Sequence, residues 1–550
     1  MGLYQSGTIT GNGNESSGAQ ENTRALLALH PFFVCPSPFP AVSSHFQQYG
    51  IPPPYYWNMK KILILLFLSA TVPAWAQFQL KGKILHYSGK DSLAINIPLI
   101  YGFHPENTVR IPVAGDGTFN IALPAQSIRF ASLYYQRRSY SLLLSPGKEL
   151  TVQWDEQNKQ LQPLSGSALQ ENTLLRKINF DETPFFLQHE TGLMPLDELN
   201  STIRQPYFHQ QQQKTNTVQA SDLPWSYKKL IAAELRYLTF NHLNDLARSN
   251  MRNRAALDSF IISVFDSSRI EPEVWPAGPQ YFAFAGNYVR YLETKAFRQI
   301  KKENIPSSEP IPYFGISLDS ATVLVNKYGK PYWRWIGSLQ NFPPDVTEVY
   351  NYQQIINLYQ YKDLTQAQHL AAAFRQRFPA SRFNPDIDQK INGLRQMLAQ
   401  HASNKDIVVI DSVRSIYDVI KTLKGKVVYL DVWGTWCGPC KEQLKHTGPL
   451  KAAFKNKAVA FVYLDMDEDH RENTWREFIK VNGLAGIHFR KNRQTIAPIW
   501  KELLAEHPDK REYYPQYFIF DKTGKPAVAK AFQPDDKEKL YRQIEEVLAR

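Results

Sequence analysis

The sequence is short of cysteine, of long apolar runs and of basic clusters, and each shortage excludes a class of protein. Only three Cys occur in 550 residues, too few for a secreted scaffold held together by disulfides. No segment reaches the 18 or more apolar residues that a membrane-spanning helix needs. Lys and Arg outnumber Asp and Glu by 63 to 51. These basic residues form no long run that could bind along a phosphate backbone, so we expect no nucleic-acid partner.

The composition otherwise fits a folded protein of several domains. Hydrophobic residues make up 43% and charged residues 21% of the chain, and 36 Pro with 27 Gly are too few for a low-complexity sequence. At roughly 100 to 200 residues per domain, the length predicts about three to five domains. The chain is therefore too long for a single compact core.

The segment 59–76 has the order of a secretory signal peptide. Two lysines follow Met59, an apolar stretch covers 62–72, and a small-x-small sequence ends at Ala76. We therefore expect a periplasmic protein that is cleaved near Ala76, begins near Gln77 and does not associate with the membrane afterwards. An apolar stretch retained as a membrane anchor is the alternative.

Residues 1–58 do not fit this arrangement, because a signal peptide is read at the start of a chain. We expect translation to begin at Met59, which makes 1–58 an untranslated or disordered extension and removes Cys35; a real N-terminal extension is the alternative. The mature chain then contains only Cys437 and Cys440. Such a pair has no structural disulfide to compete with and is free to cycle between thiols and disulfide.

Three patterns divide the mature chain. Period-two alternation with turn residues predicts a small antiparallel β-domain over 77–160. Helical periodicity, broken by Pro-containing loops, predicts a mainly α-helical middle region over 166–402, with one long helical stretch at 352–378. From 406 to 550, strands and helices alternate in a thioredoxin-like α/β order.

The predicted elements of 406–550 are short and closely spaced. The strands are expected at 407–410, 427–432, 459–465, 516–520 and 527–532, and the helices at 437–455, 471–482, 495–507 and 536–550.

The strongest chemical signal is Trp-Cys-Gly-Pro-Cys-Lys at 436–441, between a buried strand and a helix. Cys437 stands at the helix start, where free N–H groups and the helix dipole stabilise a thiolate and lower the thiol pKa. Cys440 lies one turn deeper on the same side, where it can attack a mixed disulfide formed by Cys437. Pro439 stiffens the first turn and loses no hydrogen bond there.

Metal and ligand sites have weaker support. A zinc site at the Cys pair would need a second pair of ligands, and no further Cys is present, so we expect no metal and no cofactor besides the redox-active disulfide. Residues 465–470 resemble the start of a calcium loop, but His470 replaces the required Gly, and we expect a solvated strand end. The aromatic cluster at 332–335 is expected in the core of the helical region.

The motif at 436–441, after an apolar strand in an exported chain, resembles the thioredoxin fold and specifically the TlpA/ResA-like periplasmic thiol-disulfide oxidoreductases. The resemblance covers about 406–550. It implies a dithiol–disulfide cycle of Cys437 and Cys440, with substrate contacts at Trp436, Gly438 and Pro439. The Gly-Pro pair matches the reducing thioredoxin type. We therefore expect a reductase of disulfide-containing exported proteins that takes electrons from a membrane donor.

The resemblance also implies roles for Asp431 and Pro515. The family often places a buried acid six residues before the first Cys, where it takes the proton of the second Cys, and Asp431 stands there. Burial should raise the pKa of Asp431; a hydrogen bond to a backbone amide is the alternative role. A cis-proline faces the disulfide in the family, and Pro515 fits by position, with Pro508 and Pro498 as alternatives. Tyr514 before it, a substrate-binding candidate, is larger than usual.

Two other functions stay open. A peroxidase of the related redoxin type would carry its Cys in a Pro-x-x-x-Thr-x-x-Cys setting, which is absent here. A binding protein would use the helical region 166–402 to recognise a peptide or an envelope component. The β-domain resembles the small N-terminal domain found ahead of redox domains in exported proteins of Bacteroidetes-type bacteria, and this likeness carries no catalytic residue across.

Overall fold

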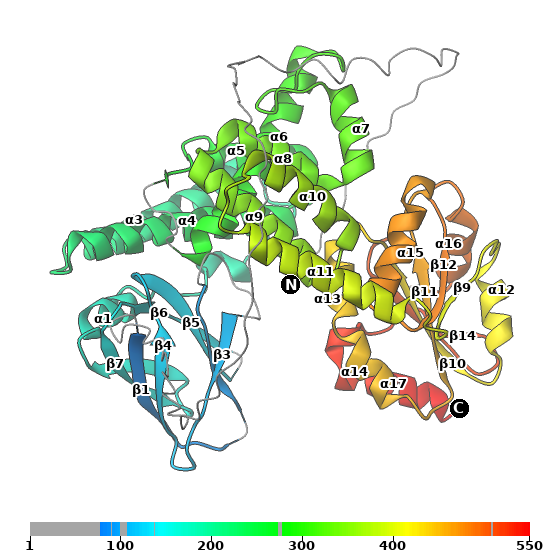
Figure 1. Cartoon of the computed structure of the whole chain (residues 1–550), viewed down its shortest axis with the longest axis horizontal. Coiled ribbons are helices and arrows are strands. Elements are labelled where there is room, and N and C mark those ends of the chain that lie inside the picture. Colours follow the sequence, from blue (N-terminus) through cyan, green and yellow to red (C-terminus); the bar gives the residue numbers. More distant parts are fainter. Residues whose placement is uncertain (1–76, 90, 99–106, 137, 273–277, 508–509) are drawn as a thin grey trace, which may run out of the picture. The chain divides into compact units, whose positions relative to one another are not determined.

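The computed structural model describes residues 77–89, 91–98, 107–136, 138–272, 278–507 and 510–550 (Figure 1). The expected signal peptide at 59–76 and the preceding 1–58, with Cys35, lie outside the described residues. Within the described residues, a β-rich part, a helical part and an α/β part follow one another, consistent with the three sequence patterns. No helix in the described ranges is long and apolar enough to cross a membrane.

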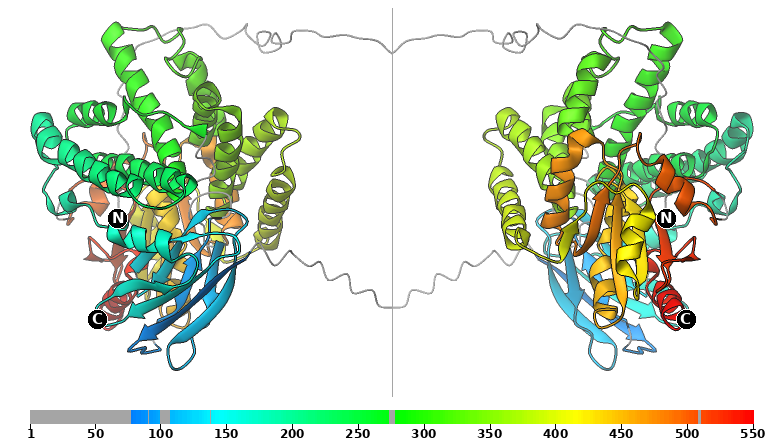
Figure 2. Two further views of the ribbon diagram at one scale, coloured as in Figure 1. Left: turned by 90° about the vertical axis from the view of Figure 1, so that its left-hand side faces the viewer. Right: turned by 90° about the vertical axis from the view of Figure 1, so that its right-hand side faces the viewer.

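Two four-stranded sheets make up the N-terminal part, with the strand orders β4-β1-β7-β8 and β3-β2-β5-β6. Buried apolar side chains from both sheets form one core cluster, and Figure 2 shows these blue to cyan strands from two directions. The strands are β1 (Gln77–Leu85), β2 (Leu93–Asn96), β3 (Thr108–Ile111), β4 (Thr118–Pro124), β5 (Arg129–Tyr135), β6 (Arg138–Leu144), β7 (Glu149–Asp155) and β8 (Gln160–Ser165).

The prediction of a purely antiparallel domain over 77–160 is wrong in one pairing. β1 and β7 are parallel, whereas the other pairings between described strands of this N-terminal part are antiparallel. β7 reaches β1 only after the chain has passed through the second sheet, and such a crossover leaves no local turn signal. The domain also extends further than predicted, because β8 ends at Ser165.

The middle part is helical, as predicted, and its helices share one large apolar core. Trp333 and Trp335 are buried in it, and Trp333 stacks on Phe314 with ring centroids 3.9 Å apart, so the aromatic cluster belongs to the core. The helices are α1 (Leu169–Lys177), α2 (Leu196–Leu199), α3 (Gln205–Gln219), α4 (Trp225–Asn250), α5 (Arg254–Phe265), α6 (Pro279–Glu303), α7 (Leu318–Tyr328), α8 (Lys330–Asn341), α9 (Pro344–Gln360), α10 (Leu364–Arg377) and α11 (Asn384–His401).

The long helical stretch predicted at 352–378 is divided between α9 and α10. Lys362 adopts a left-handed backbone conformation with φ of 53°, which ends a right-handed helix. Asp363 then caps α10, because its side chain accepts the backbone N–H of Gln366 at 3.3 Å. The turn between the two helices therefore places Asp363 at a fixed position.

The C-terminal part contains a six-stranded sheet with the order β14-β13-β10-β11-β12-β9. β10, β11, β12 and β9 run parallel, whereas β13 and β14 are antiparallel to their neighbours. The strands are β9 (Ile407–Val409), β10 (Val427–Trp433), β11 (Val459–Asp465), β12 (Gly486–Arg490), β13 (Gln516–Phe520) and β14 (Pro526–Val528). The helices are α12 (Ile416–Ile420), α13 (Gly438–Leu444), α14 (Thr447–Ala453), α15 (Glu472–Val481), α16 (Ala497–Leu503) and α17 (Glu538–Leu548).

Helices cover both faces of this sheet, so the central strand β10 is buried along its whole length. Val428, Leu430 and Val432 pack with α12 and α16, whereas Val427 and Tyr429 face the opposite side with α14 and α17 (Figure 1). This two-sided burial explains the continuous apolar run that predicted the strand. The architecture is the thioredoxin-like fold predicted for 406–550.

Several details of the α/β part differ from the sequence prediction, among them the unpredicted helix α12. The helix expected at 437–455 is split into α13 and α14, because Pro449 has no N–H to donate to the carbonyl of Lys445. The strand expected at 527–532 is limited to the three residues of β14. β12 was not predicted, because its short sequence Gly-Ile-His-Phe-Arg carries little strand pattern.

Candidate active site

Cys437 and Cys440 form a disulfide at the start of α13, directly after β10. Their sulfur atoms are 2.01 Å apart. Cys437 is the N-cap residue of α13, and its Sγ accepts the backbone N–H of Cys440 at 3.2 Å. Cys437 is 4% exposed and Cys440 is 1% exposed. The sulfur at the helix start is thus the more accessible one, and the N–H groups there favour its thiolate once the disulfide is reduced.

A buried acid after the neighbouring strand holds the loop before the Cys pair. The carboxylate of Asp467 accepts the backbone N–H and the hydroxyl of Thr435, both at 2.8 Å. Arg471 lies 3.1 Å from that carboxylate and donates to the Thr435 hydroxyl at 3.1 Å. β10 and β11 are parallel, so their carboxyl ends meet at one edge of the sheet. Asp467 therefore fixes the loop that leads to Cys437.

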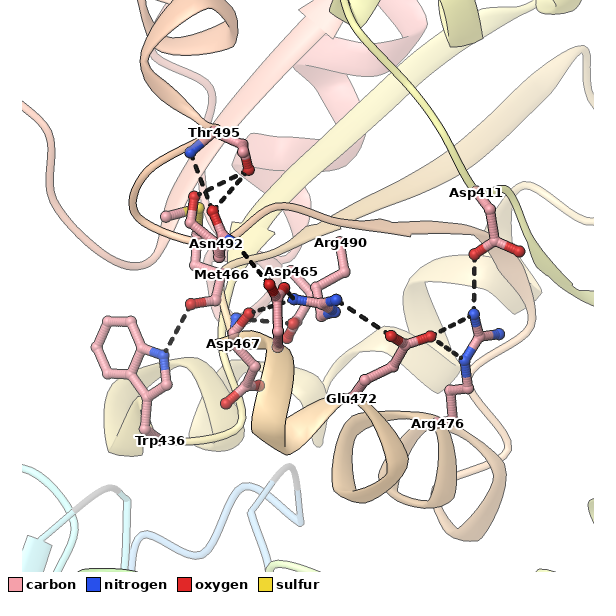
Figure 3. Close-up of polar contacts among 11 residues, drawn as sticks. Asp411, Trp436, Asp465, Met466, Asp467, Glu472, Arg476, Arg490, Asn492 and Thr495 are labelled. Carbon is pink, nitrogen blue, oxygen red and sulfur yellow. Dashed lines mark hydrogen bonds and ion pairs between the residues drawn. The ribbon is translucent and has the colours of Figure 1, made fainter. Parts of the chain in front are cut away.

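The solvated strand end predicted at 465–470 is wrong for its first half, because Asp465 and Asp467 are fully buried, whereas Asp469 and His470 are exposed. The backbone N–H of Asp467 donates to Asp465 at 2.9 Å. Burial, followed by the negative charge of Asp467, raises the pKa of Asp465 well above its ordinary value. Figure 3 shows Arg490 beside these acids, where it donates to the Asp467 carbonyl at 2.9 Å and lies 3.2 Å from Glu472.

Sequence reasoning missed this network, although the sequence contains a signal for it. Asp465-Met466-Asp467 stands at the end of the strand predicted at 459–465, and the Cys motif at 436–441 follows the strand predicted at 427–432. A prediction that these two strands pair in parallel would have placed the acids beside the motif. Asp467 holds the loop in position and its carboxylate is paired with Arg471, whereas Asp465 accepts the backbone N–H of Asp467.

Exposed and half-buried groups surround Cys437 on the outside. Trp436 is 40% exposed, and its indole N–H donates to the Met466 carbonyl at 3.4 Å (Figure 3). Its ring contacts that of Tyr514 edge to face, with centroids 5.2 Å apart. Gly438 is exposed and Pro439 is half-buried. The four predicted substrate-binding residues therefore lie around one small surface at the disulfide.

Pro515 precedes β13, the neighbour of β10, and the Tyr514–Pro515 peptide bond is cis. Tyr514 packs against the apolar cluster that contains both Cys residues. Of the two alternatives, Pro498 lies within α16, and Pro508 lies outside the described residues. Burial raises the pKa of Tyr514 to about 12, so its hydroxyl stays protonated at neutral pH.

Asp431 is a buried acid in the middle of the sheet. It lies in β10 between Tyr463 of β11 and Tyr517 of β13, and it is 2% exposed. Its Oδ1 has no hydrogen-bond partner among the described residues. Burial raises the pKa of Asp431 to about 8, and the charge of Lys451 opposes this shift. A carboxyl group in this state can accept a proton near neutral pH.

Lys451 of α14 is half-buried and lies close to Tyr463, the neighbour of Asp431 in β11. Its ammonium lies 4.8 Å from the ring centroid of Tyr463 and donates to the Ala485 carbonyl. Burial lowers the pKa of Lys451 to about 8, while the Asp431 charge opposes the shift. The acid and the lysine therefore share one poorly solvated region beneath the helix that follows the Cys pair.

The comparisons with known proteins concern this same part of the chain. The Redoxin family matches residues 410–548. The chain is similar to the thiol-disulfide oxidoreductase ResA of a Bacillus cereus strain, with 31% identity over 129 residues, 23% of this chain and 67% of the relative. ResA of Bacillus anthracis is 30% identical over 129 residues, with the same 23% and 67% coverage.

Two solved structures are also similar to this part. One is a thiol-disulfide oxidoreductase from Bacteroides vulgatus, at 26% identity, covering 24% of this chain and 78% of that one, with a TM-score of 0.20. The other is a thiol:disulfide interchange protein DsbE from Chlorobium tepidum, at 28% identity, covering 24% of this chain and 84% of that one, with a TM-score of 0.20.

The Redoxin match extends over strands β10 to β14 and over α13, which Cys437 caps. The names of the relatives give a chemistry that a Cys-Gly-Pro-Cys disulfide performs. With its C-terminal part, the chain belongs to the ResA-like thiol-disulfide oxidoreductases of the redoxin family, and it is an enzyme of that class.

Proposed function

We propose that the protein reduces disulfides in exported proteins through a dithiol–disulfide cycle of Cys437 and Cys440. The observation that carries this proposal is the position of Cys437. It caps α13, lies beside the exposed Trp436 and Gly438, and has the more deeply buried Cys440 as its only sulfur partner within the described residues. A thiol in this position can meet a substrate, and its neighbour can then complete the exchange.

The cycle starts from the reduced enzyme. The Cys437 thiolate attacks one sulfur of the substrate disulfide, so that a mixed disulfide forms and the other substrate sulfur leaves as a thiolate. Cys440 then loses its proton to Asp431 and attacks Cys437 Sγ. This step forms the Cys437–Cys440 disulfide and releases the second substrate thiolate. Substrate has gained two electrons, the enzyme has lost two, and the protons end on the substrate thiols.

The direction of electron flow rests on Gly438 and Pro439. A Gly-Pro pair between the Cys residues matches the reducing type, for which thioredoxin has a potential near about −270 mV. A reductase needs a donor that returns two electrons and two protons to the Cys437–Cys440 disulfide. For an exported enzyme we assign this role to a dithiol donor held in the membrane.

An insulin-reduction assay tests the proposed activity. The reduced mature protein is expected to accelerate the reduction of insulin by dithiothreitol, and alkylation of both thiols is expected to abolish this acceleration. Both expectations follow because Cys437 and Cys440 are the only thiols of the mature chain. The reaction is followed by the turbidity of the released insulin chain, with mock-treated protein as the control.

Two further measurements on the same protein could contradict the reductase proposal. Consumption of a hydroperoxide by the same thiols, without insulin reduction, would favour a redoxin-type peroxidase. Equal binding of a peptide or envelope component before and after alkylation, without any thiol-dependent activity, would favour a binding protein that uses the helical region.

Export is tested separately on the protein purified from its own cells. The mature chain is expected to begin near Gln77, where β1 starts, because the small-x-small sequence ends at Ala76. N-terminal sequencing measures the start. Recovery of peptides from 1–58 in digests of intact cells would show that the extension is part of the protein and that 59–76 is not read as an N-terminal signal.

A further inference from the structure

A buried ion pair joins the helix of the Cys pair to the helical part. The ammonium of Lys441, the residue after Cys440, lies 2.7 Å from Oδ2 of Asp363. The two side chains are 9% and 1% exposed, and 78 positions separate them in the sequence. Exposed ion pairs contribute little because water solvates both charges, but this pair is shielded from water.

Lys441 is held in place next to the redox centre. Its backbone N–H donates to the carbonyl of Cys437 at 3.1 Å, so the residue belongs to the first turn of α13. Its ammonium lies 5.3 Å from the ring centroid of Phe478 and 5.8 Å from that of Tyr361. The position of this positive charge relative to the two sulfur atoms is therefore fixed by packing as well as by Asp363.

Asp363, the partner of Lys441 in the helical part, is held in place by α10. It caps α10, with its carboxylate accepting the backbone N–H of Gln366 at 3.3 Å and the Gln366 side-chain amide at 2.8 Å. A second set of contacts joins the helical part to α15. His401 Nδ1 lies 3.0 Å from the carbonyl of Lys480, and Val481 of α15 belongs to the apolar core of the helical part. The helical part is thus fixed against both α13 and α15.

We propose that Asp363 is a positioning residue of the redox centre, which holds the Lys441 ammonium and offsets its charge at the Cys pair. A positive charge near a thiolate stabilises it, and a negative charge destabilises it. Stabilising the thiolate stabilises the reduced enzyme and makes the disulfide a stronger oxidant. The helical part is then a component of the redox centre, because it supplies the acid that keeps the potential low.

The other titratable groups around Lys441 are the same in the wild type and in a variant that lacks the Asp363 charge. They are Glu442 and Lys445 of α13, which are 2.8 Å apart, Tyr361 at the end of α9, and Glu477 of α15. Burial, opposed by the Thr365 hydroxyl and supported by the Asp363 charge, raises the pKa of Glu477. The inference uses only the thiol–disulfide chemistry, so it does not depend on the direction of electron flow proposed above.

The test measures the equilibrium of the mature protein with glutathione redox buffers and the pKa of the Cys437 thiol. Asp363→Asn keeps the size of the side chain and its capping ability but removes the negative charge. We expect its equilibrium to shift about three- to tenfold towards the reduced enzyme, the size of effect that one partly screened charge produces, with a lower thiol pKa. Lys441→Gln is expected to shift both quantities in the opposite direction.

Asp388→Asn is the matched control, because Asp388 of the same helical part forms an exposed pair with Arg375; its potential should equal that of the wild type. The double variant Asp363→Asn with Lys441→Gln should return towards the wild type. Wild-type potentials and thiol pKa values in both single variants, with lower melting temperatures, would overturn the proposal. If Asp363→Asn does not fold, Lys441→Gln decides, since it leaves the cap of α10 intact: a wild-type potential refutes the proposal.

Discussion

Replacing Cys440 with Ser is expected to leave the enzyme covalently attached to its substrate. Cys437 still caps α13 and can attack a substrate disulfide, but no second thiol is present to displace the substrate. Turnover should therefore stop after a single event per molecule. Non-reducing electrophoresis and intact-mass measurement check this, with the added mass equal to that of the substrate and removed by dithiothreitol.

Cys437→Ser provides the matched control. The remaining Cys440 is 1% exposed against 4% for Cys437 and lies one turn deeper in α13, so we expect a protein disulfide to reach it far less readily. We expect no mixed disulfide and no turnover from this variant. The opposite result, with adducts on Cys437→Ser and none on Cys440→Ser, would exchange the attacking and resolving roles.

The central strands of the α/β part were predictable because they are buried on both faces. β10, β11 and β13 are mostly apolar, with Asp431 as the polar residue inside β10. Only a sheet covered by helices on both sides needs strands of this kind. Strand partners were less predictable. The parallel pairing of β1 with β7 joins segments about 70 residues apart, and the sequence of neither strand indicates which strand it pairs with.

The residues of the candidate site likewise include some that the sequence predicts and some that it does not. Cys437 and Cys440 were predictable from their motif, whereas Asp431 and Pro515 were predicted through the family resemblance, which places them relative to that motif and to a strand. The acids that hold the site were not predicted, since Asp467 meets Thr435 only when two parallel strands end together. Asp363 was the least predictable, because its contact with Lys441 depends on how the helical part packs on α13 and α15.

Asp431→Asn is expected to slow the resolution step by roughly 10 to 10⁴-fold, the range that general-base catalysis supplies. In the wild type, burial raises the pKa of Asp431 to about 8, so the carboxylate can take the proton of Cys440 near neutral pH. The amide of Asn cannot. The first attack by Cys437 should remain nearly unchanged, because the start of α13 activates that thiol. Stopped-flow measurement with a small disulfide separates the two steps.

The same substitution is expected to raise stability in a pH-dependent manner. The pKa of Asp431 rises from an ordinary 3.8 to about 8 in the folded protein, so folding favours the protonated acid. Its contribution to stability is complete below pH 3.8 and is lost as the pH rises through about 8. The Asn variant has no such loss. Its melting temperature should therefore exceed that of the wild type by an increasing margin between these two pH values.

The melts are best compared on the oxidised protein between pH 5 and 8 (roughly the window set by the Asp431 shift), because the disulfide then holds no titrating thiol. In this range Lys451, whose pKa burial lowers to about 8, begins to lose its charge in the folded protein only towards the upper end, and it is present in both the wild type and the variant. An acid that instead serves as acceptor for a backbone amide would cost stability when replaced, since the amide is left unpaired. Unchanged resolution kinetics together with a lower melting temperature would therefore reduce Asp431 to that structural role and remove it from the proton path.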